Sequence, residues 1–336
     1  LKRHYPDVFA TAILNSQPMG FYAPAQLVRD AKEHGVDVRP VDVNFSDWDN
    51  TLEPDGEGYR ALRLGLRQIK GFSKKAANIL INARNKPFSG LFDIYLRTCL
   101  STRVLEQLAK ADAYQSIGLS RRKALWAIHA LPSATLPLFK TDEYRKNPDV
   151  YLKPMSAGEE VIHDYAALKL SLKNHPVALL RKILDPNQII PSNQLRNVKN
   201  GTIVSVVGLI LVRQRPSTAS GTIFITIEDE TDVANLIIWP KIFERFRQTI
   251  MAAKLVLASG KLQREGKVMH IIIEQLSDLT HYLKNLSNTD FNHTKTLDFP
   301  ITFYTHKQTT KKKIESDLTN TSLTYDHRLF RSRNFH

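Results

Sequence analysis

The sequence predicts a multidomain α+β protein, helical in its first part and with a small strand barrel near its end. Three observations carry this prediction. The length of 336 residues suits two or three domains. Apolar residues recur at helical spacing in several segments before residue 175, and five runs rich in Val and Ile follow from residue 201.

The first segment, residues 1–58, begins with two helices. "LKRHYPDVFATAILN" repeats apolar residues at helical spacing without a capping residue at its start, as if upstream sequence were missing. "PAQLVRDAKEH" predicts a second helix that begins at Pro24 and ends before Gly35. The alternating valines of "VDVRPVDV" predict a short strand at a sheet edge, because Pro40 has no amide to donate. "NFSDWDNTLEPDGEG" is predicted to be a loop.

Residues 59–130 predict several short helices joined by tight turns, and "RLGLRQIKGFSKKAANILINAR" is the most informative stretch. The apolar residues of "LGLRQI" indicate a short helix. Gly71 then permits a backbone turn that a side chain would obstruct. We expect Phe72 to be buried beneath the turn and Ser73 to cap the next helix. The apolar face of that helix is Ala76, Ala77, Leu80 and Ile81.

This helix-hairpin-helix pattern predicts a phosphate-binding corner. The hairpin exposes main-chain amides at a helix N-terminus, and three lysines add positive charge there. The candidate duplex-binding residues are Lys70, Gly71, Phe72, Ser73, Lys74 and Lys75. Because such contacts carry no sequence information, they would bind any duplex. An ordinary two-helix corner with solvated lysines is the alternative, and glycine is the usual residue where Ser73 stands.

A second, degenerate hairpin is expected within residues 89–118, where Arg103 and Lys110 either belong to it or are plain surface residues. Residues 131–199 predict a linker and helical connector. Prolines interrupt its first part, and Ser156 and Glu159 then form the capping box of a clear helix. Residues 283–336 form a polar, basic tail without a sustained period, and this tail is predicted to be mostly disordered.

Five strand-like runs occupy residues 200–282, and the helical stretch "KIFERFRQTIMAA" lies between the third and the fourth. This is the element order of an OB-fold barrel. Such barrels bind single strands by stacking bases on aromatic residues along a basic groove. For Phe224, packing in the barrel core is an equal alternative, and Trp239 is expected to close the barrel. The candidate single-strand-binding residues are Arg213, Arg215, Phe224, Arg264 and Lys267.

Composition narrows the function further. Lys and Arg number 47 against 33 Asp and Glu, and the net charge of +14 favours an anionic partner, most commonly nucleic acid. The single cysteine, Cys99, excludes an internal disulfide and a cysteine zinc knuckle, and its setting predicts a small buried residue. No apolar run is long enough to span a membrane, and we see no secretion signal, so a cytoplasmic location is expected.

Two acidic stretches are possible metal sites. Asp42, Asp47 and Asp49 could hold Mg²⁺, but no phosphate-binding element lies beside them in the sequence. "EDETD", residues 228–232, is better explained as a hairpin turn between two strands. The sequence therefore predicts neither a metal site nor a catalytic residue.

Three stretches together resemble a known family. "LNSQPMGFYAPAQLVRDAKEHGVDVRPVDVN", "ALRLGLRQIKG" and "GLILVRQRPSTASGTIFITIEDETDVANLIIWPKIFERFR" resemble the C-terminal part of bacterial C-family, alpha-subunit-like DNA polymerases. The resemblance is closest to the error-prone, damage-induced member. It covers about residues 1–282, and the final "SRNFH" is similar to that family's ending, whereas residues 285–331 depart from the family in composition.

The resemblance implies a domain arrangement. Residues 1–58 would be the end of a fingers domain, residues 59–130 a tandem helix-hairpin-helix domain that holds duplex product, and residues 200–282 an OB-fold domain near single-stranded template. It also implies a role in DNA replication and in damage-induced translesion synthesis or repair. DNA would be the partner, with a sliding clamp and a translesion accessory protein as further partners.

The same resemblance bears on catalysis. The family's three metal-binding aspartates and its PHP domain lie upstream of the matched part. The chain is therefore expected to hold no cofactor and not to polymerise alone, while Mg²⁺ would serve the full-length nucleotidyltransferase.

Two alternatives remain at this point. The barrel alone would also suit an RNA-binding module such as a tRNA-anticodon-binding domain, and competition between RNA and DNA would distinguish these. The chain could instead be chiefly a non-catalytic scaffold for repair proteins, in which case it would co-purify with a clamp or an accessory protein without binding DNA.

Overall fold

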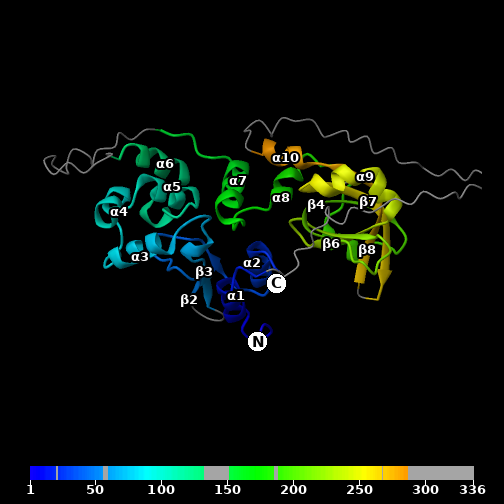
Figure 1. Ribbon diagram of the computed structural model, residues 1–336, viewed down its shortest axis with the longest axis horizontal. Helices are drawn as coiled ribbons and strands as arrows, with labels where there is room; N and C mark the ends of the chain where they lie inside the picture. The colour runs from blue at the N-terminus through cyan, green and yellow to red at the C-terminus, as the bar shows by residue number, and fades with distance from the viewer. Residues whose placement is uncertain (20–21, 56–59, 132–150, 185–187, 267, 287–336) are drawn as a thin grey trace, which may run out of the picture. The chain divides into compact units, whose positions relative to one another are not determined.

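The computed structural model describes residues 1–19, 22–55, 60–131, 151–184, 188–266 and 268–286 (Figure 1). The described residues form two compact units, the first from residues 1–179 and 281–286 and the second from residues 180–280. Most of the predicted basic tail and the proline-interrupted part of the predicted linker lie outside the described residues. The predicted disorder of the tail therefore stays a prediction.

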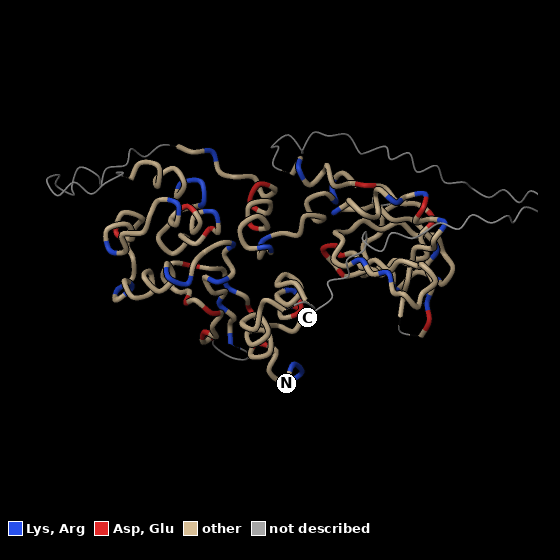
Figure 2. Tube along the Cα trace, viewed as in Figure 1, with Lys and Arg blue, Asp and Glu red and all other residues tan. Residues whose placement is uncertain are grey.

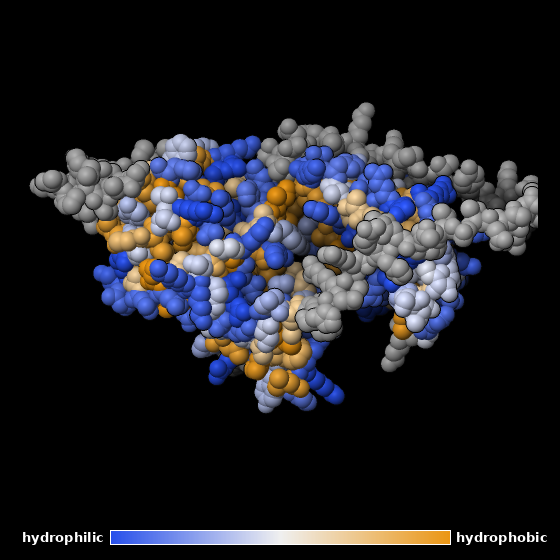
Figure 3. Space-filling view, in the orientation of Figure 1, coloured by the Kyte–Doolittle hydropathy of each residue, from blue (hydrophilic) through white to orange (hydrophobic). Residues whose placement is uncertain are grey.

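The first unit opens with the helices α1 (Pro6–Asn15) and α2 (Pro24–Glu33), as the sequence predicts. Gly35 follows α2 with a φ of 81°, a left-handed conformation that suits glycine at a helix end. At the N-terminal end of this unit, Leu1, Tyr5 and Val8 remain exposed, and Figure 3 shows an apolar area over α1.

A small sheet follows, in the order β1 (Val38–Arg39), β3 (Ala61–Arg63) and β2 (Thr51–Glu53). β1 pairs parallel with β3 at the sheet edge, as the position of Pro40 predicts. The prediction of a loop at β2 and of a helix at β3 is wrong. Both strands have three residues, too few to show alternation, and they form because each finds a partner in the folded chain.

The remainder of the first unit is helical. Its core contains fully buried leucines from several elements, such as Leu62, Leu80 and Leu105. Burial of each such side chain contributes about 1.5–3 kcal/mol. The elements are η1 (Leu66–Gln68), α3 (Lys74–Ala83), α4 (Leu91–Thr98), α5 (Thr102–Lys110), η2 (Gln115–Ile117), α6 (Arg121–His129), α7 (Ala157–Leu168) and α8 (Pro176–Leu180), which runs to the unit boundary.

Two local predictions in this unit have opposite outcomes. The capping box at α7 is confirmed, because Ser156 Oγ accepts from the Glu159 amide at 3.2 Å and Glu159 Oε2 accepts from the Ser156 amide at 2.8 Å. The expectation that Cys99 is buried is wrong. Cys99 is exposed and ends α4 in a left-handed conformation with a φ of 51°. Cys99 follows the last helical residue, so the helical spacing that buries Ile94 and Thr98 does not extend to it.

The second unit is a closed barrel of five strands in the order β4-β5-β6-β8-β7. A helix, α9 (Pro240–Ala252), lies between the third and fourth strands in sequence, so the predicted OB-fold element order is confirmed. A short η4 (Ser192–Asn197) precedes the barrel and α10 (Thr280–Asn285) follows it. The strands are β4 (Ile203–Gln214), β5 (Ile223–Glu228), β6 (Val233–Ile238), β7 (Leu255–Glu265) and β8 (Val268–Asp278).

Barrel closure depends on close approach of the backbone rather than on Trp239. A Cβ at Gly260 would lie 2.0 Å from the Ile272 carbonyl oxygen, at a register shift between β7 and β8. Only glycine fits there. Trp239 is 51% exposed and stands at the N-cap of α9, so the expectation that it closes the barrel is wrong.

Candidate nucleic-acid interface

The corner predicted at Gly71 is present in the first unit. Gly71 has a φ of 75°, which turns the chain between η1 and α3. Phe72 is buried at 6% exposure, and Ser73 Oγ accepts from the Ala76 amide at 3.1 Å as the N-cap of α3. The predicted helix before the turn is shorter than expected, since only the three residues of η1 are helical and the preceding residues belong to β3 and its exit.

The corner leaves a group of main-chain donors unused. Within the described part of the chain, no hydrogen bond uses the amides of Gly71, Ser73, Lys74 or Lys75. Three of them belong to the N-terminal turn of α3, where amides lack intrahelical acceptors and the helix dipole is positive. Gly71, Ser73, Lys74 and Lys75 are all exposed residues, so the corner lies at the surface of the unit.

The lysines of the corner are also free of acidic neighbours. Lys70, Lys74 and Lys75 are exposed, and none of them forms an ion pair with any described residue. Their charge is therefore available to an external anion. The predicted convergence of glycine, cap and lysines is confirmed as geometry, whereas its use in binding DNA stays a prediction.

Two hydrogen bonds fix the corner against neighbouring helices. The Lys70 amide donates to the Ala167 carbonyl at 2.8 Å, at the C-terminal end of α7. The Gln107 side-chain amide on α5 donates to the Gly71 carbonyl at 3.2 Å. The hairpin is thus held in one conformation by parts of the chain that lie far away in sequence.

A second hairpin lies between η2 and α6. Gly118 has a φ of 73° and Ser120 is the N-cap of α6, so "GLSRR" repeats the arrangement of "GFSKK". The predicted range for this copy, residues 89–118, reaches the turn only at its last residue, and the basic residues of the hairpin follow it. Arg103 and Lys110, the basic residues considered for it, both lie on α5. The repeated pentapeptide was the signal that could have located the hairpin.

The second hairpin differs from the first in its charges. Arg121 is fully buried and pairs with Glu160 at 2.6 Å and with Asp164. Arg122 pairs with Glu159 at 3.1 Å. Figure 2 shows the acidic residues of α7 that supply these partners. The two arginines therefore have internal anions. Among the described residues, the two basic residues directly after the N-cap are unpaired in the first hairpin and paired in the second.

On the barrel, Phe224 faces outward. Its neighbours Ile223 and Ile225 are buried in the core, and side chains alternate along a strand. Phe224 is half-buried on the outer wall, opposite Gln214 of β4 and Ile237 of β6. It is absent from the described core cluster, which disfavours the core-packing alternative.

The predicted basic partners of Phe224 do not join it in one groove. Arg213 stands opposite Ile225, on the other side of the strand, and its Nε donates to the Ile250 carbonyl at 2.7 Å at the end of α9. Burial lowers the pKa of Arg213. Arg215 lies over the Phe243 ring, with 5.6 Å between the guanidinium carbon and the ring centroid.

Of the remaining two candidates, Arg264 lies near the end of β7. Arg264 donates to the Arg196 carbonyl at 2.6 Å, so it anchors η4 to the barrel. Lys267 lies outside the described residues. A role of these side chains in binding a single strand is therefore still a prediction.

The acidic stretches serve the fold. Asp42 accepts from the Ser116 hydroxyl at 2.7 Å, Asp47 pairs with Arg84, and Asp49 pairs with Arg67. Nowhere in the described ranges do three or more His, Cys, Asp or Glu side chains gather as a metal would require.

The "EDETD" stretch forms the predicted hairpin turn between β5 and β6. Burial alone would raise the pKa of Asp229, but donors from Thr231, from the Asp232 amide and from the Ser192 amide outweigh it and lower that pKa. The Ser192 amide donates to Asp229 Oδ2 at 2.7 Å, and the Arg181 guanidinium forms an ion pair with the same oxygen at 2.9 Å. Asp229 therefore ties the segment before the barrel to this turn.

The helices of the described residues give no membrane span, since each is too short or too polar for one.

Comparison with known families agrees with both units. The family described as helix-hairpin-helix motif matches residues 35–124, and the family described as OB-fold nucleic acid binding domain matches residues 194–279. The first match contains both hairpins, and the second contains the whole barrel.

Longer relatives match most of the chain. "Error-prone DNA polymerase 1" of Rhizobium meliloti (strain 1021) is 46% identical over 308 aligned residues, covering 84% of this chain and 28% of its own length. "Error-prone DNA polymerase 1" of Agrobacterium fabrum is 47% identical over 302 residues, covering 85% of this chain and 28% of its own length. The chain thus spans little more than a quarter of these relatives.

Among solved structures, the asparaginyl-tRNA synthetase of Pyrococcus horikoshii matches 24% of this chain and 20% of its own, at 17% identity and a TM-score of 0.22. A score of this size carries no argument about function.

Proposed function

The chain is a homologue of the error-prone DNA polymerases over 84% of its length, and on this premise we propose that it is the DNA-binding portion of such an enzyme. Its role would lie in DNA replication and in damage-induced translesion synthesis or repair, in the cytoplasm. The observation that carries the proposal is the open corner at Gly71, where unused amides and unpaired lysines converge.

The corner supports duplex binding by simple electrostatics. A phosphate oxygen at the N-terminus of α3 would accept from the free amides of Ser73 and Lys74, and the lysine ammonium groups would neutralise the neighbouring phosphates. Contacts of this kind hold any sequence, as a polymerase requires of the duplex that it has just made.

The barrel supports a complementary role on unpaired template. Phe224 offers an aromatic ring on the outer wall, and base stacking on such a ring contributes about 1–3 kcal/mol per base. The basic side chains predicted to share this role are held elsewhere, so the aromatic contact is the stronger part of this proposal.

We place catalysis outside this chain. The resemblance puts the metal-binding aspartates upstream, and the acids of the described residues that were candidates for a metal site are committed to arginines and hydroxyls. Mg²⁺ would accordingly be bound by the palm of a full-length enzyme. A sliding clamp and a translesion accessory protein are proposed as further partners.

The duplex proposal is tested by the double change Lys74→Ala and Lys75→Ala. Fluorescence anisotropy with short labelled duplexes of unrelated sequence should show a loss of affinity that is the same for all of them. The slope of log K against log salt should become shallower by about 0.9 for each phosphate that is no longer neutralised. Lys86→Ala, an exposed lysine just beyond the C-terminal end of α3, is the matched control.

Unchanged affinity in the double variant, or a loss confined to one sequence, would show that the corner does not bind duplex DNA. Preference for RNA over DNA in direct competition would instead support the anticodon-binding type of OB module.

A further inference from the structure

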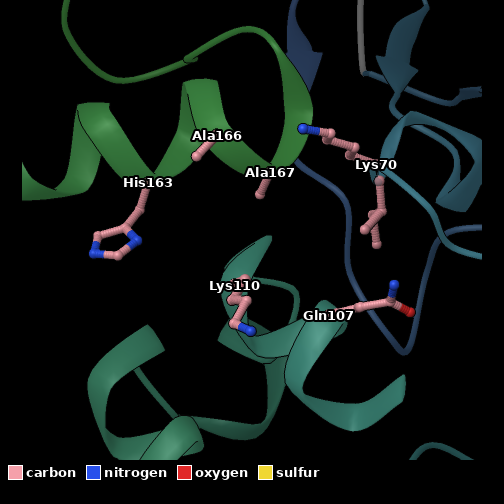
Figure 4. Close-up of a pocket in the computed structure, with 7 residues that line it drawn as sticks. Lys70, Gln107, Lys110, His163, Ala166 and Ala167 are labelled. Atoms are coloured by element: carbon pink, nitrogen blue, oxygen red, sulfur yellow. The ribbon is translucent and has the colours of Figure 1, made fainter. Parts of the chain in front are cut away.

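A cavity adjoins the hairpin between α5 and α7. Its volume is about 140 Å³, and its lining residues are Ile69, Lys70, Gln107, Lys110, His163, Ala166 and Ala167. Figure 4 shows Gln107 and Lys110 on α5, and His163, Ala166 and Ala167 on α7, with Lys70 completing the cavity from the hairpin side. The proposed function assigns no role to this cavity.

The polar groups of the cavity are suited to an anion. Lys70 has no acidic partner among the described residues, and Lys110 has among them only the exposed contact with Glu106 at 3.3 Å. Burial, followed by the charge of Arg121, lowers the pKa of His163. At neutral pH its imidazole is therefore an uncharged group that can donate one hydrogen bond.

The apolar side chains that line the cavity indicate which kind of anion it would bind. Ile69 and Ala167 are buried and apolar, and the exposed methyl group of Ala166 adds to them. An inorganic ion has no apolar surface to pack against these side chains. A phosphodiester has such a surface, because the deoxyribose carbon atoms beside its phosphate can pack on apolar side chains.

The cavity and the hairpin are one rigid arrangement. Gln107 lines the cavity and also donates to the Gly71 carbonyl, while the Lys70 amide donates to the Ala167 carbonyl at 2.8 Å. The cavity therefore adjoins the hairpin, and Lys70 belongs to both.

We propose that this cavity is a second phosphate subsite, in which Lys70 and Lys110 together bind the phosphodiester next to the one held by the hairpin amides. This inference rests on the proposed function. Gln107 has a positioning role, since it orients the hairpin carbonyl, and His163 donates to the same phosphate.

The first test uses charge removal in the full chain. Lys70→Ala, Lys110→Ala and the double variant are compared by anisotropy with a labelled duplex over a range of salt concentrations. Two lysines on one phosphate predict that the slope of log K against log salt falls by about 0.9 in the double variant and by less in either single variant, because the remaining lysine still faces the phosphate. Two independent contacts would give about 1.8 and would overturn the shared subsite.

The second test places a larger side chain in the cavity and leaves both lysines unchanged. Ala166 is exposed on α7, so Ala166→Glu and Ala166→Gln should both fold, as circular dichroism would check. Both side chains have the same size, but only the carboxylate competes with a phosphate. We expect Ala166→Glu to weaken duplex binding at least tenfold and Ala166→Gln to weaken it less than threefold.

Each outcome distinguishes this inference from the proposed function. Equal affinities for the Glu and Gln variants, or an unchanged salt slope in the double variant of Lys70 and Lys110, would overturn the subsite. If these variants bind normally while Lys74→Ala with Lys75→Ala weakens binding, the hairpin proposal survives alone. If the hairpin variant also binds normally, the proposed function itself fails.

Discussion

The two hairpin glycines offer a matched experiment, Gly71→Ala against Gly118→Ala. Their φ angles are 75° and 73°, so an alanine would meet the same left-handed backbone at either position. That conformation costs about 1–2 kcal/mol for a residue with a Cβ. Reduced freedom of the unfolded chain offsets about 0.4–1 kcal/mol of it. A net loss of about 1 kcal/mol from the first unit is therefore expected in each variant.

Neighbouring atoms do not alter this expectation. A Cβ at Gly71 would lie 3.4 Å from the Gln107 side-chain nitrogen, an ordinary contact, and a Cβ at Gly118 would have nothing within 4 Å. Both variants should thus fold and lose the same stability. Urea unfolding followed by fluorescence of Trp48 and Trp126, which lie in the first unit, measures this loss.

Duplex binding should separate the two variants. Alanine at position 71 strains the turn that presents the free amides, and a distortion costing about 1.4 kcal/mol of binding energy is a tenfold loss of affinity. Alanine at position 118 strains a hairpin whose arginines already pair with α7, so we expect less than a twofold loss. Equal losses of affinity, measured by anisotropy at one salt concentration, would refute the argument that only the first hairpin is open.

Three further predictions concern other residues. Arg121→Met should lower the free energy of unfolding of the first unit by about 3–5 kcal/mol, because it leaves the buried Asp164 without its cation. Arg122→Ala should lower it by less than about 1 kcal/mol. Urea unfolding measures both values, and similar losses would contradict this account of the pairing. The lowered pKa of Asp229 means that the stability it contributes is present above its unfolded pKa of about 3.9 and is lost as the pH falls through the folded value. Asp229→Asn should therefore lower the urea midpoint of the barrel at pH 7, and its effect should shrink as the pH falls below the unfolded pKa, whereas a pH-independent difference would argue against it. Phe224→Ala should weaken binding of a labelled single strand by about 1–3 kcal/mol and leave duplex binding unchanged, and equal effects on the two would remove the barrel from template binding.

Features encoded over a short span of sequence were predicted well. The strand runs of the barrel, the capping box of α7 and the turn at Gly71 each depend on residues within a few positions of one another. Local propensity and hydrogen bonding decide such features, so one sequence contains the necessary information.

Features that depend on distant partners were missed. β2 and β3 have three residues each and exist only because they pair with one another. Arg213 is of a residue type that often binds anionic ligands. Its side chain instead donates to the Ile250 carbonyl at the end of α9, and Ile250 lies 37 positions away in the chain. No periodicity reports a contact of this kind, and the candidate single-strand site was the least predictable part for that reason.

The net charge of the chain also leaves the partners of individual side chains undetermined. A net charge of +14 indicates an anionic partner but does not say which cations meet it. In the first unit, Arg63, Arg67 and Arg84 each pair with an acid of the same chain, as do both arginines of the second hairpin. A planar guanidinium with several donors suits such pairing, whereas an ammonium on a flexible stem serves as a point charge. Because the lysines beside Gly71 have no acidic partner among the described residues, the duplex footprint should follow the lysines rather than the sum of basic residues.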